Sequence, residues 1–156
     1  MSAAASRAPR GKYVPPADGL HAEFFARAAT GQLHLQRCSH CGLFRHPPSY
    51  YCASCSSSEW TWTPSAGHGS LFSWTVSYRP YDTAWTDDVP WVTAIIELDE
   101  GPRLVGWLRD VDLTELALGQ RLVVRPEPVS DDFTFLRLGP APAVPDGLEL
   151  GSRCRR

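Results

Sequence analysis

The sequence contains no long hydrophobic run, no nucleotide-binding fingerprint and only one lysine. No stretch approaches the ~18–20 apolar residues that a membrane-spanning helix requires. The basic residues at the N-terminus are not followed by the apolar segment of a secretory signal. We therefore expect a soluble, cytoplasmic protein without a membrane partner. Neither a P-loop nor a Gly-x-Gly-x-x-Gly pattern occurs, which argues against phosphate or dinucleotide binding through those motifs.

A catalytic constellation is also missing. No histidine has a serine, cysteine or carboxylate at a spacing that indicates a nucleophile or general base, so we predict no catalytic residue. His68, in a Gly-His-Gly segment, is free to reach a ligand, and Asp82, Asp87 and Asp88 form a local acidic cluster. Solvated surface positions are the simpler explanation for both features.

What the sequence does contain is two Cys-x-x-Cys pairs, ten residues apart, in CSHCGLFRHPPSYYCASC. In a reducing compartment this spacing indicates a metal site rather than a disulfide framework. Four thiolates form a closed tetrahedral cage that holds one structural Zn²⁺, with iron as the alternative, and leave no open position for catalysis. His40 and His46 are interpreted as surface residues and Cys154 as a bystander. The predicted ligands are Cys38, Cys41, Cys52 and Cys55.

The remaining pattern predicts a mainly β protein: a short N-terminal helix, the zinc ribbon and a five-stranded OB-fold barrel. Residues 18–30 read as an amphipathic helix with Asp18 as N-cap and an apolar face that includes Leu20 and Phe24. Because so short a helix is marginal alone, it packs either on its own domain or on another protein. The predicted divisions are a disordered segment 1–17, helix and ribbon 18–66, barrel 67–139 and a flexible tail 140–156.

Short alternating segments after residue 70 predict the barrel strands. In the first, Phe72, Trp74, Val76 and Tyr78 share one face. Residues 111–117 are expected to form a single helical turn between the third and fourth strands, as in an OB-fold. The other predicted strands are 91–98, 103–108, 121–125 and 133–138.

Aromatic residues and arginine concentrate in the loop after the first barrel strand. Such residues are enriched at protein interfaces and are unfavourable in an uncovered loop. Either the tryptophans fold back on the barrel end, or the loop contacts a partner enzyme or borders its CoA channel. The predicted contact residues are Tyr78, Arg79, Tyr81, Trp85 and Trp91, together with Phe24 and Phe25 of the helix.

Four segments between about residues 20 and 138 carry a resemblance: LQRCSHCGLFRHPP, CASC followed by SSSEWTW, GHGSLFSWTVSYRP and PWVTAIIELDEGPRLVGWL. Together they resemble the bacterial and archaeal family of acyl-CoA-associated OB-fold proteins with a rubredoxin-like zinc ribbon. Trp91 and Trp107 are bulkier than we expect at those positions, so the local packing is expected to differ.

Proteins of this family are accessory subunits beside thiolase-like enzymes or MaoC-like enoyl-CoA hydratases. The resemblance implies a chain that does not act alone but organises an aldolase, acyltransferase or hydratase in a hetero-oligomer. Acyl-CoA would be held jointly with the partner, in steroid side-chain or other lipid degradation.

The alternative is a nucleic-acid-binding module, because zinc ribbons and OB-folds also serve that purpose. Nucleic-acid binding needs a positively charged track. Residues 67–139 carry twelve acidic and six basic groups. This charge favours the accessory subunit, and we expect no nucleic-acid partner.

Overall fold

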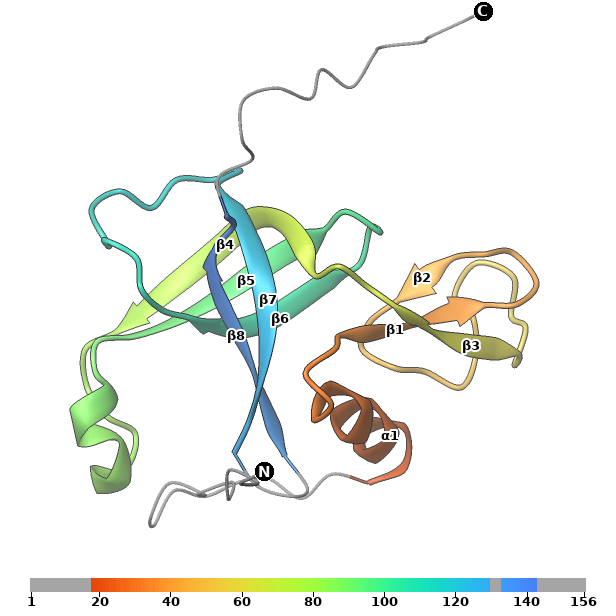
Figure 1. Ribbon diagram of the computed structural model, residues 1–156, viewed down its shortest axis with the longest axis horizontal. Coiled ribbons are helices and arrows are strands. Elements are labelled where there is room, and N and C mark those ends of the chain that lie inside the picture. The colour runs from red at the N-terminus through yellow and green to blue at the C-terminus, as the bar shows by residue number, and fades with distance from the viewer. Residues whose placement is uncertain (1–17, 130–132, 143–156) are drawn as a thin grey trace, which may run out of the picture.

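The computed structural model describes residues 18–129 and 133–142, so the predictions for residues 1–17, for Cys154 and for most of the tail lie outside the described residues. The N-terminal part contains one helix and a three-stranded antiparallel sheet of order β2-β1-β3 (Figure 1). Its elements are α1 (Gly19–Ala28), β1 (His34–Cys38), β2 (Phe44–Arg45) and β3 (Trp60–Pro64).

The second part is a closed five-stranded barrel of order β4-β5-β6-β8-β7. Strands β6 and β8 pair in parallel, and the other neighbours pair antiparallel. The predicted fold class of helix, zinc ribbon and OB-fold barrel is therefore confirmed. The strands are β4 (His68–Ser77), β5 (Trp91–Leu98), β6 (Arg103–Leu108), β7 (Arg121–Pro128) and β8 (Thr134–Pro140).

The alternation of β5 explains why it lines the barrel. Val92, Ala94, Ile96 and Leu98 are all buried, whereas the residues between them face outward. Burial of the valine, isoleucine and leucine side chains contributes about 1.5–3 kcal/mol each. The same buried cluster includes Leu33 and Leu35 of the ribbon part. The two parts therefore share one hydrophobic core.

Helix α1 lies where the ribbon meets the barrel (Figure 1) and contacts β1, β7 and β8. Leu20, Phe24 and Ala28 are its buried residues, so the helix packs on its own chain. Asp18 occupies the N-cap position, but its side chain makes no capping hydrogen bond; its backbone carbonyl accepts from the N–H groups of His21 and Ala22.

Strand β4 departs from the predicted single face. A β-bulge between Leu71 and Ser73 shifts its register against β5. A bulge adds a residue to one strand and changes which side chains face the core. Leu71 is therefore buried, whereas Phe72 is 43% exposed and is covered by the guanidinium of Arg103, 3.5 Å from its ring centroid.

The helical turn predicted for residues 111–117 is not formed. Asp112 accepts hydrogen bonds from the backbone N–H and the hydroxyl of Thr114, which stabilises a non-helical turn. The helical segment lies instead between β4 and β5, as the 3₁₀ helix η1 (Thr83–Asp88), where the Asp82 carboxylate accepts from the N–H of Ala84. Among the described residues, no helix is long and apolar enough to cross a membrane.

Candidate functional site

The two cysteine pairs lie in two turns with the same hydrogen-bond pattern. In the first, the N–H of Gly42 donates to the Cys38 carbonyl at 3.0 Å, and the N–H of Cys38 donates to Leu43. In the second, Ser56 donates to the Cys52 carbonyl at 2.8 Å, and Cys52 donates to Ser57. The residue after each pair has a positive φ, 76° at Gly42 and 59° at Ser56. Each turn therefore bends tightly around its two thiols.

The segment between the two turns is held by a buried side chain. Gln36 of β1 is fully buried, and its Oε1 accepts from the Nε of Arg45 and from the backbone N–H of Ser49, both at 2.8 Å. A buried amide with such partners fixes the loop to the sheet. This brings the second cysteine pair back beside the first.

The four sulfur atoms fit one metal ion. All four Sγ atoms lie within 4.8 Å of one another, with 3.6 Å between Cys38 and Cys55 and 3.5 Å between Cys41 and Cys52. A tetrahedral zinc with Zn–S bonds of about 2.3 Å requires sulfur atoms roughly 3.8 Å apart. The predicted cage of Cys38, Cys41, Cys52 and Cys55 is thus positioned to hold one metal ion.

The turns prepare two of the thiols for metal binding. Hydrogen bonding from the Cys41 backbone lowers the pKa of Cys38 to about 6 despite its burial. The Cys55 backbone likewise lowers the pKa of Cys52. At Cys55 the N–H of Ser57 favours the thiolate, but burial and the three neighbouring thiols raise the pKa to about 12. A cation is therefore needed to hold all four charges together.

His46 is not the surface residue that the sequence suggests. Its ring is partly buried against Phe24, with ring centroids 5.0 Å apart. Burial, with a smaller effect of the charge on His21, lowers the pKa of His46 to about 4. His40, in contrast, is exposed as predicted.

We predict a pH dependence of stability from His46. Its folded pKa of about 4 lies below its ordinary value of 6.5, so the unfolded chain binds the proton first. The stabilisation is complete above pH 6.5 and is lost as the pH falls through about 4, by up to about 3 kcal/mol. Urea unfolding of the wild type and His46→Gln at each pH should show a shallower decline for the variant. Parallel curves would contradict this prediction.

A cluster of aromatic rings covers the outer face of the barrel. The indoles of Trp91 and Trp107 stack with centroids 3.9 Å apart and planes 9° apart. Trp85 of η1 meets Trp91 edge-on at 5.1 Å. Phe135 of β8 contacts both Trp107 and Phe133. The ring centroid of Phe133 lies 4.8 Å from that of Phe25 in α1, so the cluster extends to the helix. We call these six residues the aromatic face: Phe25, Trp85, Trp91, Trp107, Phe133 and Phe135.

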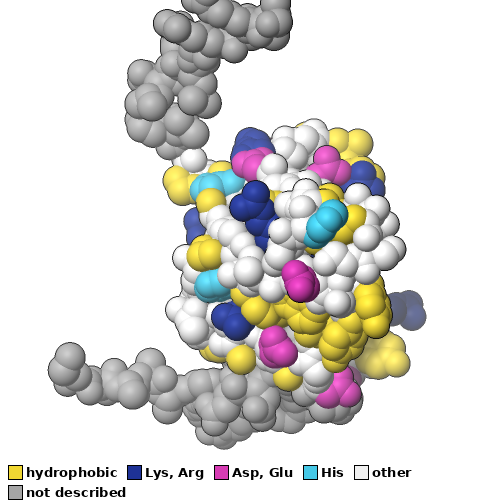
Figure 2. Space-filling model, turned by 90° about the vertical axis from the view of Figure 1, so that its right-hand side faces the viewer, with side chains coloured by type: hydrophobic (Ala, Val, Ile, Leu, Met, Phe, Trp, Pro, Cys, Tyr) yellow, Lys and Arg dark blue, Asp and Glu magenta, His cyan; other side chains and the backbone are white. Residues whose placement is uncertain are grey.

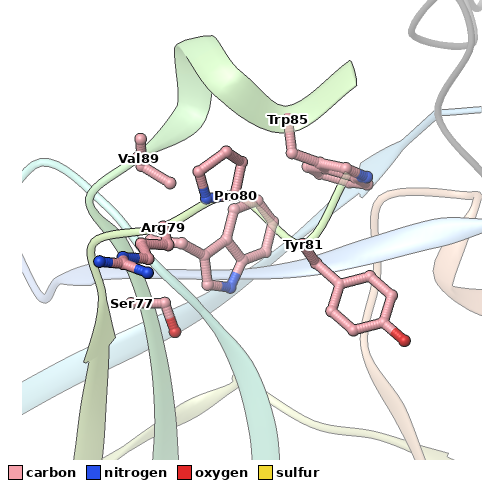
Figure 3. A pocket seen from close by; sticks show the side chains of 7 residues that line it. Ser77, Arg79, Pro80, Tyr81, Trp85 and Val89 are labelled. Atoms are coloured by element: carbon pink, nitrogen blue, oxygen red, sulfur yellow. The ribbon is translucent and has the colours of Figure 1, made fainter. Parts of the chain in front are cut away.

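The loop between β4 and β5 encloses one end of this face. Figure 3 shows the resulting cavity, with Arg79 beside Ser77 at one end and the Tyr81 hydroxyl pointing away. Its volume is about 480 Å³. Tyr81 is fully exposed and Tyr78 is 71% exposed, whereas Trp85 and Trp91 are half-buried against each other. The cavity is lined by Ser77, Arg79, Pro80, Tyr81, Trp85, Val89 and Trp91.

The structure places the two phenylalanines of α1 differently. Phe24 is 2% exposed and packs against His46 and Trp62, so its predicted partner contact is corrected to a core contact. Phe25 is half-buried beside Phe133. The sequence-based site omitted Trp107, Phe133 and Phe135. The alternation of side chains along a strand could have indicated two of them, because Trp107 and Phe135 alternate with the buried residues of β6 and β8.

The comparisons with known proteins agree with this geometry. The family model "ChsH2, rubredoxin-like zinc ribbon domain" matches residues 25–61, and "ChsH2, C-terminal OB-fold domain" matches residues 62–126. A solved chain described as "Ltp2-ChsH2(DUF35) aldolase" superposes with a TM-score of 0.74 at 31% identity. This match covers 83% of the present chain and 100% of the solved one.

Two curated relatives are hydratase subunits. The probable enoyl-CoA hydratase alpha subunit of Thermomonospora curvata is 35% identical over 104 residues, which are 67% of this chain and 32% of the relative. The 3-oxo-4,17-pregnadiene-20-carboxyl-CoA hydratase alpha subunit of Mycobacterium tuberculosis is 36% identical over 88 residues, 56% and 27% of the respective chains. The present chain thus spans about a third or less of these relatives.

The ribbon, the barrel and their order along the chain all match the full length of the solved aldolase chain. The family model for the ribbon covers all four cysteines of the cage. The chain therefore belongs to the DUF35 family and carries the zinc-ribbon and OB-fold domains of the ChsH2 type.

Proposed function

We propose that this chain is a non-catalytic accessory subunit of an enzyme that acts on acyl-CoA thioesters. Its partner would be a thiolase-like aldolase or acyltransferase, or a MaoC-like hydratase subunit. The names of the similar proteins, an aldolase complex and two hydratase alpha subunits, support this class of partner. The relative named as a 3-oxo-4,17-pregnadiene-20-carboxyl-CoA hydratase alpha subunit supports a steroid-derived acyl-CoA as the substrate. Steroid side-chain degradation in the cytoplasm is the setting that we propose.

The observation that carries the proposal is an exposed aromatic loop on a chain whose metal cage is closed. The chain's own four cysteines fill a tetrahedral shell, which leaves no metal position for substrate. Tyr81 is fully exposed, and Tyr78 is 71% exposed beside it. Tyrosine, tryptophan and arginine are the side chains that anchor protein interfaces.

Apolar surface is also exposed on the ribbon side of the molecule, away from this loop. Figure 2, which views the molecule from that side, shows hydrophobic side chains gathered in its lower half. Patches of this kind mark interaction sites in soluble proteins. The proposed docking surface combines Tyr78, Arg79 and Tyr81 with the half-buried Trp85, Trp91 and Phe25. Acyl-CoA would be held between this surface and the partner.

Affinity purification of the tagged chain from its native host tests the proposal. We expect a thiolase-like or hydratase-like subunit in stoichiometric amount, and turnover of acyl-CoA by the pair but not by the chain alone. Tyr81→Ala should weaken the complex at least tenfold. Leu118→Ala, which removes another exposed side chain, is the matched control. Turnover by the isolated chain, or copurification of nucleic acid in place of an enzyme, would contradict the function.

A further inference from the structure

The barrel leaves part of one strand edge unpaired. Strand β6 pairs with β5 from Arg103 to Leu108, but β8 joins its other side only at Trp107 and Leu108. Within residues 18–129 and 133–142, no strand pairs with Arg103 or Val105 on that side. An edge of this kind is a template for an additional strand.

The backbone groups at this edge point outward. The carbonyl of Pro102 accepts a hydrogen bond from the N–H of Leu98 in β5. The backbone N–H and C=O groups of even-numbered residues in this segment therefore point toward β5. On the opposite side, the N–H of Arg109 donates to Leu138 of β8. Because backbone groups alternate along a strand, the N–H and C=O groups of Arg103 and Val105 face the open side.

A groove runs along the same edge. It has a volume of about 220 Å³ and brings together Val105, the stacked indoles and the phenylalanines of the aromatic face. Val105 is 57% exposed at its rim. Side chains of an added strand point alternately to the two faces of the sheet. Every second side chain would therefore enter an apolar groove while the backbone pairs with β6.

The charges around the groove favour a basic occupant. A second hollow, of about 240 Å³, shares Trp107 with the groove and is lined by Asp87, Asp88, Arg109 and Asp110. Glu127, paired in register with Phe135, adds a further carboxylate. The nearby positive charges are those of Arg109, of Arg137, which bridges Asp110 and Glu127, and of Arg103 on the edge itself, which pairs with Glu97. Five carboxylates against three guanidinium groups leave a negative rim.

We infer that an extended segment of the partner subunit adds to the Arg103–Val105 edge of β6 as a further strand. The segment carries aliphatic or aromatic side chains at alternate positions and is flanked by lysine or arginine. Main-chain hydrogen bonds to β6 fix the register of the added strand, and the apolar groove selects the side chains that this strand carries. This inference rests on the proposed function for its partner, but it concerns an edge that can be tested without that partner.

A proline substitution at position 105 tests the open edge of β6 separately from its pairing with β5. Val105→Pro removes the N–H on the open side, whereas the even-numbered residues keep their pairing with β5. Val105→Thr keeps both the N–H and the branched shape and is the matched control. In the reconstituted complex we expect Val105→Pro to weaken binding at least tenfold and Val105→Thr to change it less than twofold. Equal affinity of the proline variant and the wild type would overturn the inference.

Two measurements cover the other outcomes. If Val105→Pro fails to fold, as shown by its metal content and thermal unfolding, amide hydrogen exchange of the wild type decides. The Val105 amide should exchange at least tenfold more slowly in the complex, and unchanged exchange would refute the edge.

The second measurement uses synthetic peptides of alternating valine and threonine, flanked by two lysines or by two glutamates at each end. The lysine peptide should shift the Val105 amide resonance of the full chain and bind more tightly than the glutamate peptide. No shift, or tighter binding of the glutamate peptide, would overturn the inference even where no CoA enzyme copurifies.

Discussion

Replacement of Cys38 by serine is expected to empty the metal cage and unfold the ribbon. The hydroxyl of serine is a poor ligand for Zn²⁺, and the remaining three thiols cannot close a tetrahedral shell. Because metal binding to such a site is coupled to folding, loss of the ion removes folding free energy. The sheet that carries the cage is small, so it has little core of its own.

The effect should extend beyond the ribbon. Leu33 and Leu35, next to the first cysteine pair, belong to the same buried cluster as Leu71 and Ile96 of the barrel. We expect the metal-to-protein ratio to fall from one to near zero and the unfolding temperature to drop by more than about 10 °C. Chelation of the wild-type protein should give the same result.

Cys154→Ser is the matched control, because it removes a thiol that the sequence assigns to no ligand set. Metal content by mass spectrometry and thermal unfolding by circular dichroism should be unchanged in this variant. A Cys38→Ser protein that keeps one metal ion and its full stability would show that the cage is misassigned.

Local signals account for the elements that sequence predicted well. The bounds of β5 and β6 agree with prediction because the alternation of β5 is uninterrupted and a Gly-Pro turn ends the hairpin. The cage follows from cysteine spacing, since each turn closes within five residues. In these segments, local spacing determines both the backbone and the side-chain direction.

The features that sequence missed depend on contacts between distant segments. A single bulge moved Phe72 out of the core, and alternation cannot reveal which strand carries an extra residue. His46 is buried by Phe24, twenty-two residues earlier in the chain. Trp91 and Trp107 stack only because β5 and β6 pair in the observed register. The candidate docking face is thus a product of strand pairing.

Gly106→Ala is expected to open the barrel where β6 meets β8. A Cβ at position 106 would lie 2.4 Å from the backbone oxygen of Leu136 and 2.8 Å from Cγ of Leu138. The first of these atoms belongs to the backbone of β8, so it cannot rotate away. Forcing a methyl group into such a contact separates the two strands and should lower the free energy of unfolding by about 3 kcal/mol.

Gly139→Ala provides the comparison within the same barrel. Its Cβ would meet the end of the flexible Arg125 side chain at 3.1 Å and, next nearest, the Arg109 oxygen at 3.9 Å. We expect a change of less than about 1 kcal/mol for this variant, because a side-chain end can move at little cost. Denaturant unfolding of both variants measures the difference. If the two substitutions prove equally mild, β6 and β8 are not packed as closely as the closed barrel requires, and the open edge at Val105 would extend past Gly106.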